Sequence, residues 1–409
     1  MNVSDLFHSA LRSLRAHKLR SFLTLLGMII SVAAIVAVVS IISGLNQMVR
    51  SEIMFLSPDM FMVSRFGMIT SRKEFLDALK RPRVTADDYA RLRAADLPTV
   101  AAVGAADGTS RIVSNGTKKL EGTSIVGVTS NMASILNITV EGGRFFSETE
   151  ESAGRYAVVI GADVRDELFG QQDPIGRTIL VAGLPLQVIG AMPKKGKSFI
   201  GGSDWDTRVY IPFSVYRKNF KSPWSDIEIY VKAKSIDQVE VAKDEVRAFI
   251  RALRHTDFRA PDPFGMLSQE TIMEFWEKIS AAIFLFITLI TGVSLFVGGI
   301  VIMNIMLVSV AERTQEIGIR MALGARKRDI LRQFLLEAAL LSVVGGIIGF
   351  VVGAGMALGV KGATGFPAQV TLSTVFLAIG LASLVGLLAG FFPAKRAANL
   401  VVIDAIRAE

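Results

Sequence analysis

Long uncharged, apolar stretches alternate with charged segments along the chain. Residues 21–49 carry no charge, and residues 22–43 among them are almost wholly apolar. Three further uncharged windows follow at 279–311, 338–360 and 372–394. About 20 apolar residues in a helix span the hydrocarbon core of a bilayer, and a charge at the centre of such a helix costs about 2.5 to 3.5 kcal/mol. The pattern therefore predicts four transmembrane α-helices.

Basic residues precede the first window, which makes a cleavable signal peptide the alternative interpretation of this part of the chain. The apolar core of a signal peptide has about 7 to 15 residues and is followed by a cleavage site with small residues. The window is longer than that, and no such site separates it from a soluble chain. A retained membrane anchor is favoured.

The distribution of Lys and Arg predicts the orientation of the helices. Thirteen of them lie in residues 1–21, 312–337 and 395–409, whereas the loop between the third and fourth windows has one. Cytoplasmic loops are enriched in basic residues, so both termini and the second connection are expected in the cytoplasm. Residues 44–278 hold 31 basic and 30 acidic residues. The net charge of +8 therefore reflects topology and contact with anionic lipid, and we expect no nucleic-acid partner.

The segment 44–278, extracytoplasmic in this topology, is long enough to bury its own core, as two packed subdomains. Thr85 is expected to start one helix, and Ser235 has the capping-box spacing that starts another. Residues 182–183 are expected to join two strands as a hairpin. An α+β domain follows from this mixture. The predicted strands are residues 124–128, 156–160, 178–181, 186–189 and 227–231.

The two membrane helices that flank this domain keep an apolar spacing of three to four residues beyond their windows. Such extensions would pair as a helical stalk. A rigid lever between the membrane and the outer domain, and a simple packing of helix ends on that domain, are equally compatible with the pattern. The residues concerned are Ile42, Leu45, Val49 and Ile53 after the first helix, and Ile272, Phe275, Trp276 and Ile279 before the second.

Residue types that carry catalysis or bind metals are scarce. The chain has no Cys and three His, of which His8 and His17 lie near the N-terminus and His255 is isolated. This excludes thiol chemistry and leaves no His cluster for a metal site or a catalytic triad. The four windows also lack the ionisable residue that ion-coupled carriers usually keep at mid-depth. We expect no catalytic residue, no metal and no cofactor on this chain.

Two local patterns imitate chemical sites. Residues 190–198 resemble a phosphate-binding loop, but five residues separate its first two glycines, where that loop has four. We interpret it as an exposed basic turn. Glu148, Glu150 and Glu151 could act as acids or bases, but a run of charges without a histidine or metal partner is more often a solvated surface.

Glycines recur every four residues in the third window, at Gly345, Gly349 and Gly353. Small residues at this spacing allow two helices to approach closely. The predicted contact could lie within the chain or between two copies of it.

The connection between the second and third windows is amphipathic. Its first part predicts a short helix with Ile317, Met321 and Ala325 on one face, followed by a Gly-Ala turn and a second helix. A surface of this kind suits docking into the groove of another protein or lying on the lipid.

The sequence of this connection, Glu316-Ile317-Gly318-Ile319-Arg320 followed by Gly324-Ala325, resembles that of the MacB/FtsX-type permeases of ABC transporters. Other fragments are similar to the same family, in the same order and over the whole chain. They are residues 11–27 at the opening, residues 126–128, 141–146, 159–161, 173–176, 188–190 and 209–212 in the periplasmic core domain, and residues 392–398 in the tail.

The resemblance implies a homodimer of eight membrane helices in the bacterial inner membrane. Each cytoplasmic connection would sit on an ATP-binding subunit, which holds ATP and Mg²⁺. Closure of those subunits would reach the outer domain through the second helix and expel an antibiotic, peptide or lipid from the periplasm or outer leaflet, a mechanism called mechanotransmission. A periplasmic adaptor and an outer-membrane channel are further expected partners. The fused nucleotide-binding domain of the macrolide exporters is absent, so we expect an ATPase recruited in trans.

On this interpretation the residues that couple the chain to the ATPase are Glu316, Gly318, Arg320, Gly324 and Arg326. The alternative is a connection whose charges are satisfied internally.

Three other functions stay open. The first is an FtsX-like signalling module that activates a cell-wall hydrolase, and the second is a lipoprotein-release permease, for which a heterodimer would be expected. A membrane-anchored enzyme ranks last. The predicted segments are residues 1–21 (an amphipathic cytoplasmic segment), 22–43, 44–278, 279–311, 312–337, 338–360, 361–371 (an extracytoplasmic loop), 372–394 and 395–409.

Overall fold

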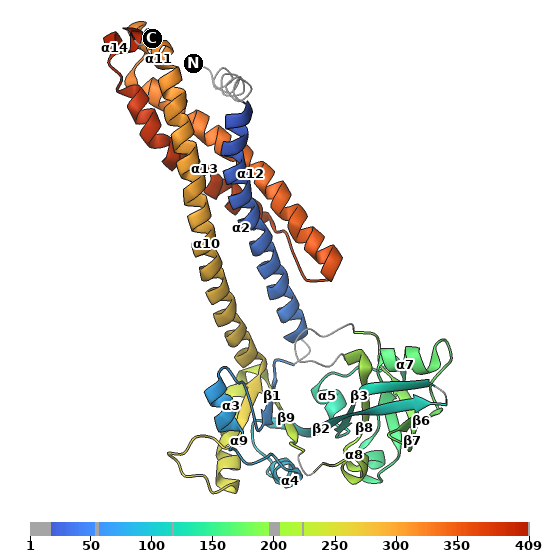
Figure 1. The fold of residues 1–409 in the computed structure, drawn as a ribbon. Coiled ribbons are helices and arrows are strands. Elements are labelled where there is room, and N and C mark those ends of the chain that lie inside the picture. The colour runs from blue at the N-terminus through green and yellow to red at the C-terminus, as the bar shows by residue number, and fades with distance from the viewer. Residues whose placement is uncertain (1–17, 54–56, 117, 196–204, 223–224, 408–409) are drawn as a thin grey trace. The chain divides into compact units, whose positions relative to one another are not determined.

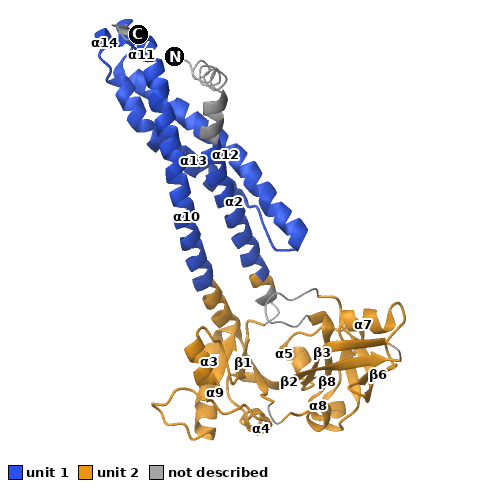
Figure 2. Ribbon diagram, viewed as in Figure 1, with its two compact units in different colours: residues 1–48, 277–409 blue, residues 49–276 orange. Residues whose placement is uncertain are grey.

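The structure is a computed structural model that describes residues 18–53, 57–116, 118–195, 205–222 and 225–407 (Figure 1). The chain forms two compact units. Figure 2 distinguishes the first, residues 1–48 with 277–409, from the second, residues 49–276. The predicted N-terminal segment 1–21 lies outside the described residues, except for its last four.

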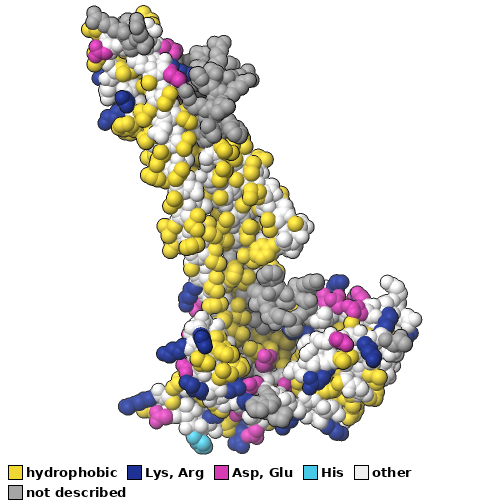
Figure 3. All heavy atoms as spheres, in the orientation of Figure 1, with side chains coloured by type: hydrophobic (Ala, Val, Ile, Leu, Met, Phe, Trp, Pro, Cys, Tyr) yellow, Lys and Arg dark blue, Asp and Glu magenta, His cyan; other side chains and the backbone are white. Residues whose placement is uncertain are grey.

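Four long helices build the first unit. All four are long and apolar enough to cross a membrane, and each predicted window lies within one of them. Figure 3 shows hydrophobic side chains over much of the visible surface of this unit. The prediction of four transmembrane helices is confirmed. They are α2 (Lys18–Ile53), α10 (Gln269–Glu312), α12 (Lys327–Thr364) and α13 (Leu372–Ala398).

Helices α2 and α10 extend beyond their predicted windows, as the apolar spacing indicated. They pair within the first unit, where the Ser280 hydroxyl donates a hydrogen bond of 3.1 Å to the side-chain oxygen of Asn46. Nearer the other end of α2, a Cβ placed on Gly27 would lie 3.7 Å from the Cα of Gly298. The two helices therefore lie against each other at both of these levels.

The glycines of α12 pack within the chain. A Cβ on Gly349 would lie 2.8 Å from the Cβ of Val32, and one on Gly353 would lie 2.5 Å from the carbonyl oxygen of Ala33. Both neighbours belong to α2. Gly345 is buried on the same helix. Of the two alternatives for these glycines, the structure shows the intrachain contact for Gly349 and Gly353.

A ten-stranded mixed sheet forms the second unit, in the order β10-β1-β9-β2-β3-β8-β5-β7-β4, with β6 pairing both β2 and β7. The β3–β8 and β5–β7 pairs are parallel and the other pairs are antiparallel. The strands are β1 (Met60–Ser64), β2 (Val100–Asn115), β3 (Lys118–Val128), β4 (Gly142–Gly143), β5 (Ala157–Ile160), β6 (Thr178–Val181), β7 (Leu184–Ala191), β8 (Arg208–Pro212), β9 (Glu228–Ala233) and β10 (Gly265–Ser268). The helices are α3 (Arg72–Ala78), α4 (Ala86–Ala94), α5 (Met132–Ile135), α6 (Glu148–Ser152), α7 (Ala162–Phe169), α8 (Phe213–Asn219) and α9 (Val239–Leu253), with 3₁₀ turns at Trp205–Thr207 and Ile236–Gln238.

Three buried clusters hold the sheet and its helices together. One packs α4 and α9 against β1, β9 and β2, and a second packs α7 and α8 against β5 to β8. These two correspond to the predicted subdomains, although one continuous sheet joins them. The third cluster contains the alternate residues of the same strands, such as Ala106 and Tyr210, so it lies on the opposite face of the sheet.

Most local predictions for this unit agree with the structure. Each predicted strand overlaps an observed one, and Ala182 and Gly183 form the two-residue turn between β6 and β7 with φ values of +48° and +85°. Thr85 forms the capping box of α4. The helix predicted after Ser235 forms as α9, but the capping role predicted for Ser235 is wrong, because its side chain makes no cap hydrogen bond and a 3₁₀ turn separates it from α9.

Candidate docking surface on the connecting helix

The connection between α10 and α12 is a short helix, α11 (Thr314–Ala322), that packs against α14 (Val402–Arg407). Gly324 ends α11 with a φ of +97°, a left-handed conformation that glycine adopts without strain. The backbone N–H of Ala325 donates to the carbonyl of Arg320 across this turn, at 3.1 Å. Arg326 then caps α12, since its N–H donates to the carboxylate of Asp329 at 3.1 Å.

The apolar face that the sequence singled out on this helix points inward. Ile317 is buried, and Met321 and Ala325 are half-buried against the core of the first unit. Gly318 is buried beside Ile317. The interpretation of this face as a docking surface is therefore wrong, because the face packs on the chain's own helices.

Two of the predicted coupling residues interact with each other. The guanidinium of Arg320 forms an ion pair with Glu316 one turn earlier on α11. The same guanidinium donates a hydrogen bond of 3.0 Å to the side-chain oxygen of Gln333, a buried residue of α12. Arg320 therefore fixes the position of α11 against α12, which agrees in part with the alternative of internally satisfied charges.

The other predicted coupling residues lie apart from this pair. Gly324 and Arg326 are exposed in the turn that follows α11, and a Cβ on Gly324 would meet nothing within 4 Å. Glu316 is exposed as well, despite its ion pair. The structure thus leaves Glu316, Gly324 and Arg326 accessible to a partner and places Gly318 out of reach.

The surface available for docking is formed by apolar residues that the sequence interpretation passed over. Ile319 and Leu323 are one turn apart on the outer face of α11, with 48% and 83% of their surface exposed. Val401 and Ile403, at the start of α14, are 59% and 67% exposed. We call these four residues the docking surface. The spacing of Ile319 and Leu323 could have indicated it, but the stripe formed by Ile317 and Met321 obscured that signal.

An ion pair with one buried partner lies at the start of α11. Arg313, the single residue between α10 and α11, places its guanidinium 3.5 Å from the carboxylate of Glu337 on α12, and Glu337 is 7% exposed. A charge this deeply buried depends on its partner. The contact ties the end of α10 to α12 at the point where the chain turns into α11.

No metal-binding cluster of three His, Asp or Glu residues occurs in the part of the chain that the structure describes. The segment 190–198, which resembles a phosphate-binding loop, begins in β7. A Cβ on Gly190 would lie 2.5 Å from the carbonyl oxygen of Arg144. This glycine is therefore required by close packing. Residues 196–198 of the same pattern lie outside the described residues.

Two family models match the chain. A MacB-like periplasmic core domain matches residues 21–249, and an FtsX-like permease C-terminal region matches residues 282–402. The macrolide export ATP-binding/permease protein MacB of Bdellovibrio bacteriovorus is 33% identical over 98% of this chain. The pyoverdine export ATP-binding/permease protein PvdT of Pseudomonas aeruginosa is 35% identical over 98% of this chain. The chain covers 61% and 58% of these two relatives.

Among solved structures, the periplasmic region of MacB from Actinobacillus actinomycetemcomitans is similar to this chain with a TM-score of 0.46 and 16% identity. The similarity covers 56% of this chain and 97% of that one.

Proposed function

The chain belongs to the ABC-transporter permeases with a MacB-like periplasmic core domain and an FtsX-like C-terminal region, and we propose that it is the permease of an ATP-driven exporter. The observation that carries this proposal is the docking surface. Ile319 and Leu323 are exposed at the connection between two membrane helices, and Val401 and Ile403 are exposed at the start of α14, which packs against α11. A group of exposed apolar side chains of this kind is typical of a protein interaction site.

The partner that we propose for this surface is an ATP-binding subunit, which would bind ATP and Mg²⁺. The relatives named above, described as ATP-binding/permease proteins, support this partner. We place the docking surface and both termini in the cytoplasm, and the second unit on the other side of a bacterial inner membrane. A second copy of the chain, a periplasmic adaptor and an outer-membrane channel complete the proposed assembly.

The contacts of α11 support mechanotransmission. Arg313 is the only residue between α10 and α11, and Arg320 links α11 to α12, so a displacement of α11 would move both helices. Helix α10 continues for 44 residues, about 66 Å, and begins directly after the sheet strand β10. A helix of this length can transmit a displacement without any polar group crossing the bilayer. We propose a hydrophobic or amphipathic substrate, such as an antibiotic, peptide or lipid. The relatives are named for the export of macrolides and of pyoverdine.

The test is co-purification with the ATP-binding subunit of the same operon, together with the ATPase rate of the complex. Leu323→Asp places a charge at the centre of the proposed interface, and we expect at least a tenfold loss of complex. Phe258→Asp is the matched control, because Phe258 is also 83% exposed but belongs to the second unit. Arg320→Glu should lower the ATPase rate by displacing α11.

An unchanged complex and ATPase rate in Leu323→Asp would contradict the assignment of the docking surface. A complex that hydrolyses ATP without stimulation by any amphipathic compound, and that instead binds a cell-wall hydrolase, would favour the signalling function over export.

A further inference from the structure

Residues 65–83, which connect β1 to α4, carry large apolar side chains on the surface of the second unit. We call this stretch the α3 segment, after the one helix that it contains. Only Ala78 is buried within that helix. Phe75, Leu76 and Leu79 are 44%, 48% and 42% exposed. At 3.6 residues per turn these three lie within about 100° of the helix circumference, so they form one apolar side that faces outward.

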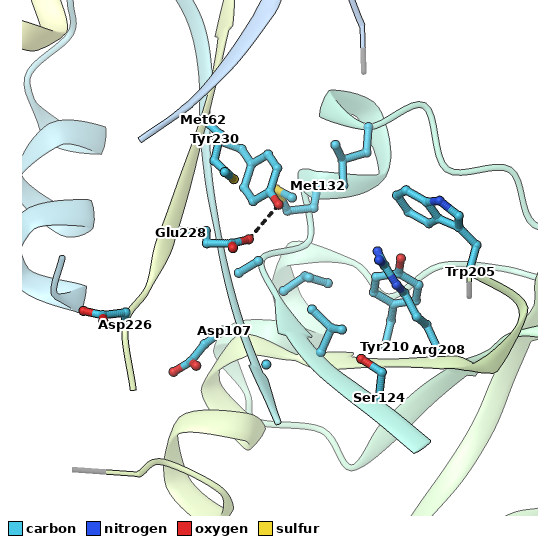
Figure 4. A pocket seen from close by; sticks show the side chains of 15 residues that line it. Met62, Asp107, Ser124, Met132, Trp205, Arg208, Tyr210, Asp226, Glu228 and Tyr230 are labelled. Atoms are coloured by element: carbon cyan, nitrogen blue, oxygen red, sulfur yellow. Dashed lines mark hydrogen bonds between the residues drawn. The ribbon is translucent and has the colours of Figure 1, made fainter. Parts of the chain in front are cut away.

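Two arginines hold the ends of the α3 segment together. The guanidinium of Arg65 donates hydrogen bonds to the carbonyl oxygens of Leu79 and, at 3.0 Å, of Arg81. In return, the guanidinium of Arg81 donates to the carbonyl oxygen of Arg65 at 3.1 Å. Arg65 also pairs with Asp226 at 3.4 Å, and Figure 4 shows Asp226 pointing away from the other side chains of the pocket drawn there. The apolar side is therefore presented by a segment that is fixed to the sheet.

The acidic side chains of the α3 segment are engaged within it. Glu74 accepts hydrogen bonds from the hydroxyl and the backbone N–H of Thr70, at 2.7 and 2.8 Å. Ser71 caps the helix by accepting from the N–H of Glu74 at 3.2 Å. Asp77 pairs with Lys80 at 2.8 Å. Contacts within the segment thus satisfy its two carboxylates, whereas its apolar side chains stay exposed.

The α3 segment is also the place where the positive charge of the second unit is concentrated. It holds six basic and two acidic residues, whereas the rest of residues 44–278 holds 25 basic and 28 acidic ones. Arg72 and Lys73 at the start of the helix and Lys80 after its end are exposed. An apolar side bordered by Lys and Arg is typical of a segment that lies in the interface of an anionic bilayer.

The α3 segment belongs to the edge of the sheet that leads into a membrane helix. A Cβ on Gly67 would lie 2.8 Å from the Cα of Gly265, at the start of the edge strand β10. Helix α10 follows β10 directly at Gln269, and its uncharged window starts at residue 279. Ten helical residues measure about 15 Å, and the headgroups extend about 5 to 7 Å from the hydrocarbon core. The chain therefore keeps this edge of the sheet close to a bilayer surface.

We propose that the α3 segment is a contact surface for an anionic lipid bilayer. Phe75, Leu76 and Leu79 would enter the boundary between headgroups and acyl chains, and Arg72 and Lys73 would face lipid phosphates. The contact would hold the second unit on the leaflet from which α10 emerges. It needs neither ATP nor a partner protein, so it stands or fails independently of the proposed export function.

The experiment places the fluorophore NBD on single cysteines of the full-length protein in nanodiscs, since the chain has no Cys of its own. Leu76→Cys reports on the proposed surface. Phe258→Cys is the control, because Phe258 is 83% exposed in the second unit but lies outside the α3 segment. The nanodiscs contain phosphatidylcholine alone or an equal mixture with phosphatidylglycerol. A lipid with a nitroxide near the head of its acyl chain quenches NBD that enters the bilayer.

In the phosphatidylglycerol mixture we expect the nitroxide lipid to quench NBD at Leu76→Cys about threefold and to leave Phe258→Cys unchanged. Phosphatidylcholine alone should give weaker quenching, because its headgroup has no net charge. Adding Arg72→Glu with Lys73→Glu should remove most of the quenching at Leu76→Cys. The matched control adds Lys118→Glu with Lys119→Glu, a neighbouring pair of exposed lysines elsewhere in the second unit, and should change nothing.

Equal quenching at the two labelled positions, or none at Leu76→Cys, would overturn the proposal. Quenching that neither the lipid charge nor the Arg72→Glu, Lys73→Glu pair alters would contradict the role of anionic headgroups. If NBD at Leu76→Cys were shielded from iodide in water but not quenched by the nitroxide lipid, a protein such as a second copy of the chain would cover the surface instead, which would also overturn the proposal.

Discussion

Glu228, half-buried on β9, is the carboxyl group whose surroundings have the clearest consequence for stability. Burial and the charge of Asp107 raise its pKa, while the hydrogen bond from Tyr230 and the charge of Arg208 lower it, and burial is the largest of these effects. The folded protein therefore retains a proton at pH values where the unfolded chain, with an ordinary pKa of about 4.3, has lost it. Wild type loses stability as the pH rises through the pKa of the folded state.

Glu228→Gln should remove this loss, because the amide stays neutral at every pH. We expect the melting temperatures of variant and wild type to be closest near pH 4, and the variant to melt increasingly above wild type as the pH rises. Thermal unfolding of the full-length protein in detergent, followed by circular dichroism, measures this. The exposed Glu121→Gln should show no such trend. A variant that melts below wild type at pH 8 would contradict this account.

Turns and helix caps that depend on a few neighbouring residues could be predicted from the sequence where those residues favour a single local structure. The turn at Ala182 and Gly183 and the capping box of Thr85 formed as predicted. Ser235 has the same kind of signal, but a 3₁₀ turn intervenes before α9, and its side chain caps nothing. The residues around the pocket in Figure 4 could not be anticipated, because strand pairing brings Glu228, Gly108 and Tyr210 together across the sheet.

Helix α11 shows which part of an amphipathic pattern a sequence can specify. The period of the apolar residues was predicted correctly, and Ile317 and Met321 do share a face. The direction of that face depends on α12 and α14, which cover it. Ile319 and Leu323, on the other face of α11, stay exposed. Whether a stripe packs internally or binds a partner is decided by tertiary contacts.

The strand β2 was missed for a related reason. Its sixteen residues include six alanines and glycines at positions 101–108, which have low intrinsic strand propensity. It nevertheless forms a central strand, because β9 and β3 pair with its two edges and supply the hydrogen bonds. Intrinsic strand propensity therefore did not predict β2, because pairing with strands on both of its sides determines its structure.

The packing of α12 on α2 gives a prediction with a matched control on one helix. Gly353→Ala would bring a Cβ within 2.5 Å of a backbone oxygen of Ala33, and we expect a loss of about 1 to 3 kcal/mol. Gly355→Ala meets nothing within 4 Å and should be neutral. Thermal unfolding in detergent compares the two variants. Equal losses would mean that this face of α12 does not pack as described.

The arrangement of membrane helices and of the domain between the first two of them was the feature that the sequence predicted best. Four uncharged windows specify four membrane helices, since hydrocarbon tolerates few charges, and the long segment between the first two windows forms the outer domain. The orientation rests on the distribution of Lys and Arg, and the proposed function depends on it. The proposed function requires the docking surface to face the cytoplasm, where ATP is available, and the outer domain to lie on the opposite side of the membrane.

Thiol labelling in intact cells tests this arrangement most directly, and the absence of Cys from the chain makes single-cysteine variants unambiguous. Leu323→Cys and Phe258→Cys occupy equally exposed positions, one on the docking surface and one in the outer domain. A membrane-impermeant maleimide should label Phe258→Cys in intact cells, or in cells with a permeabilised outer membrane, and label Leu323→Cys only after the inner membrane is opened. Labelling of both positions from the same side would contradict the proposed permease.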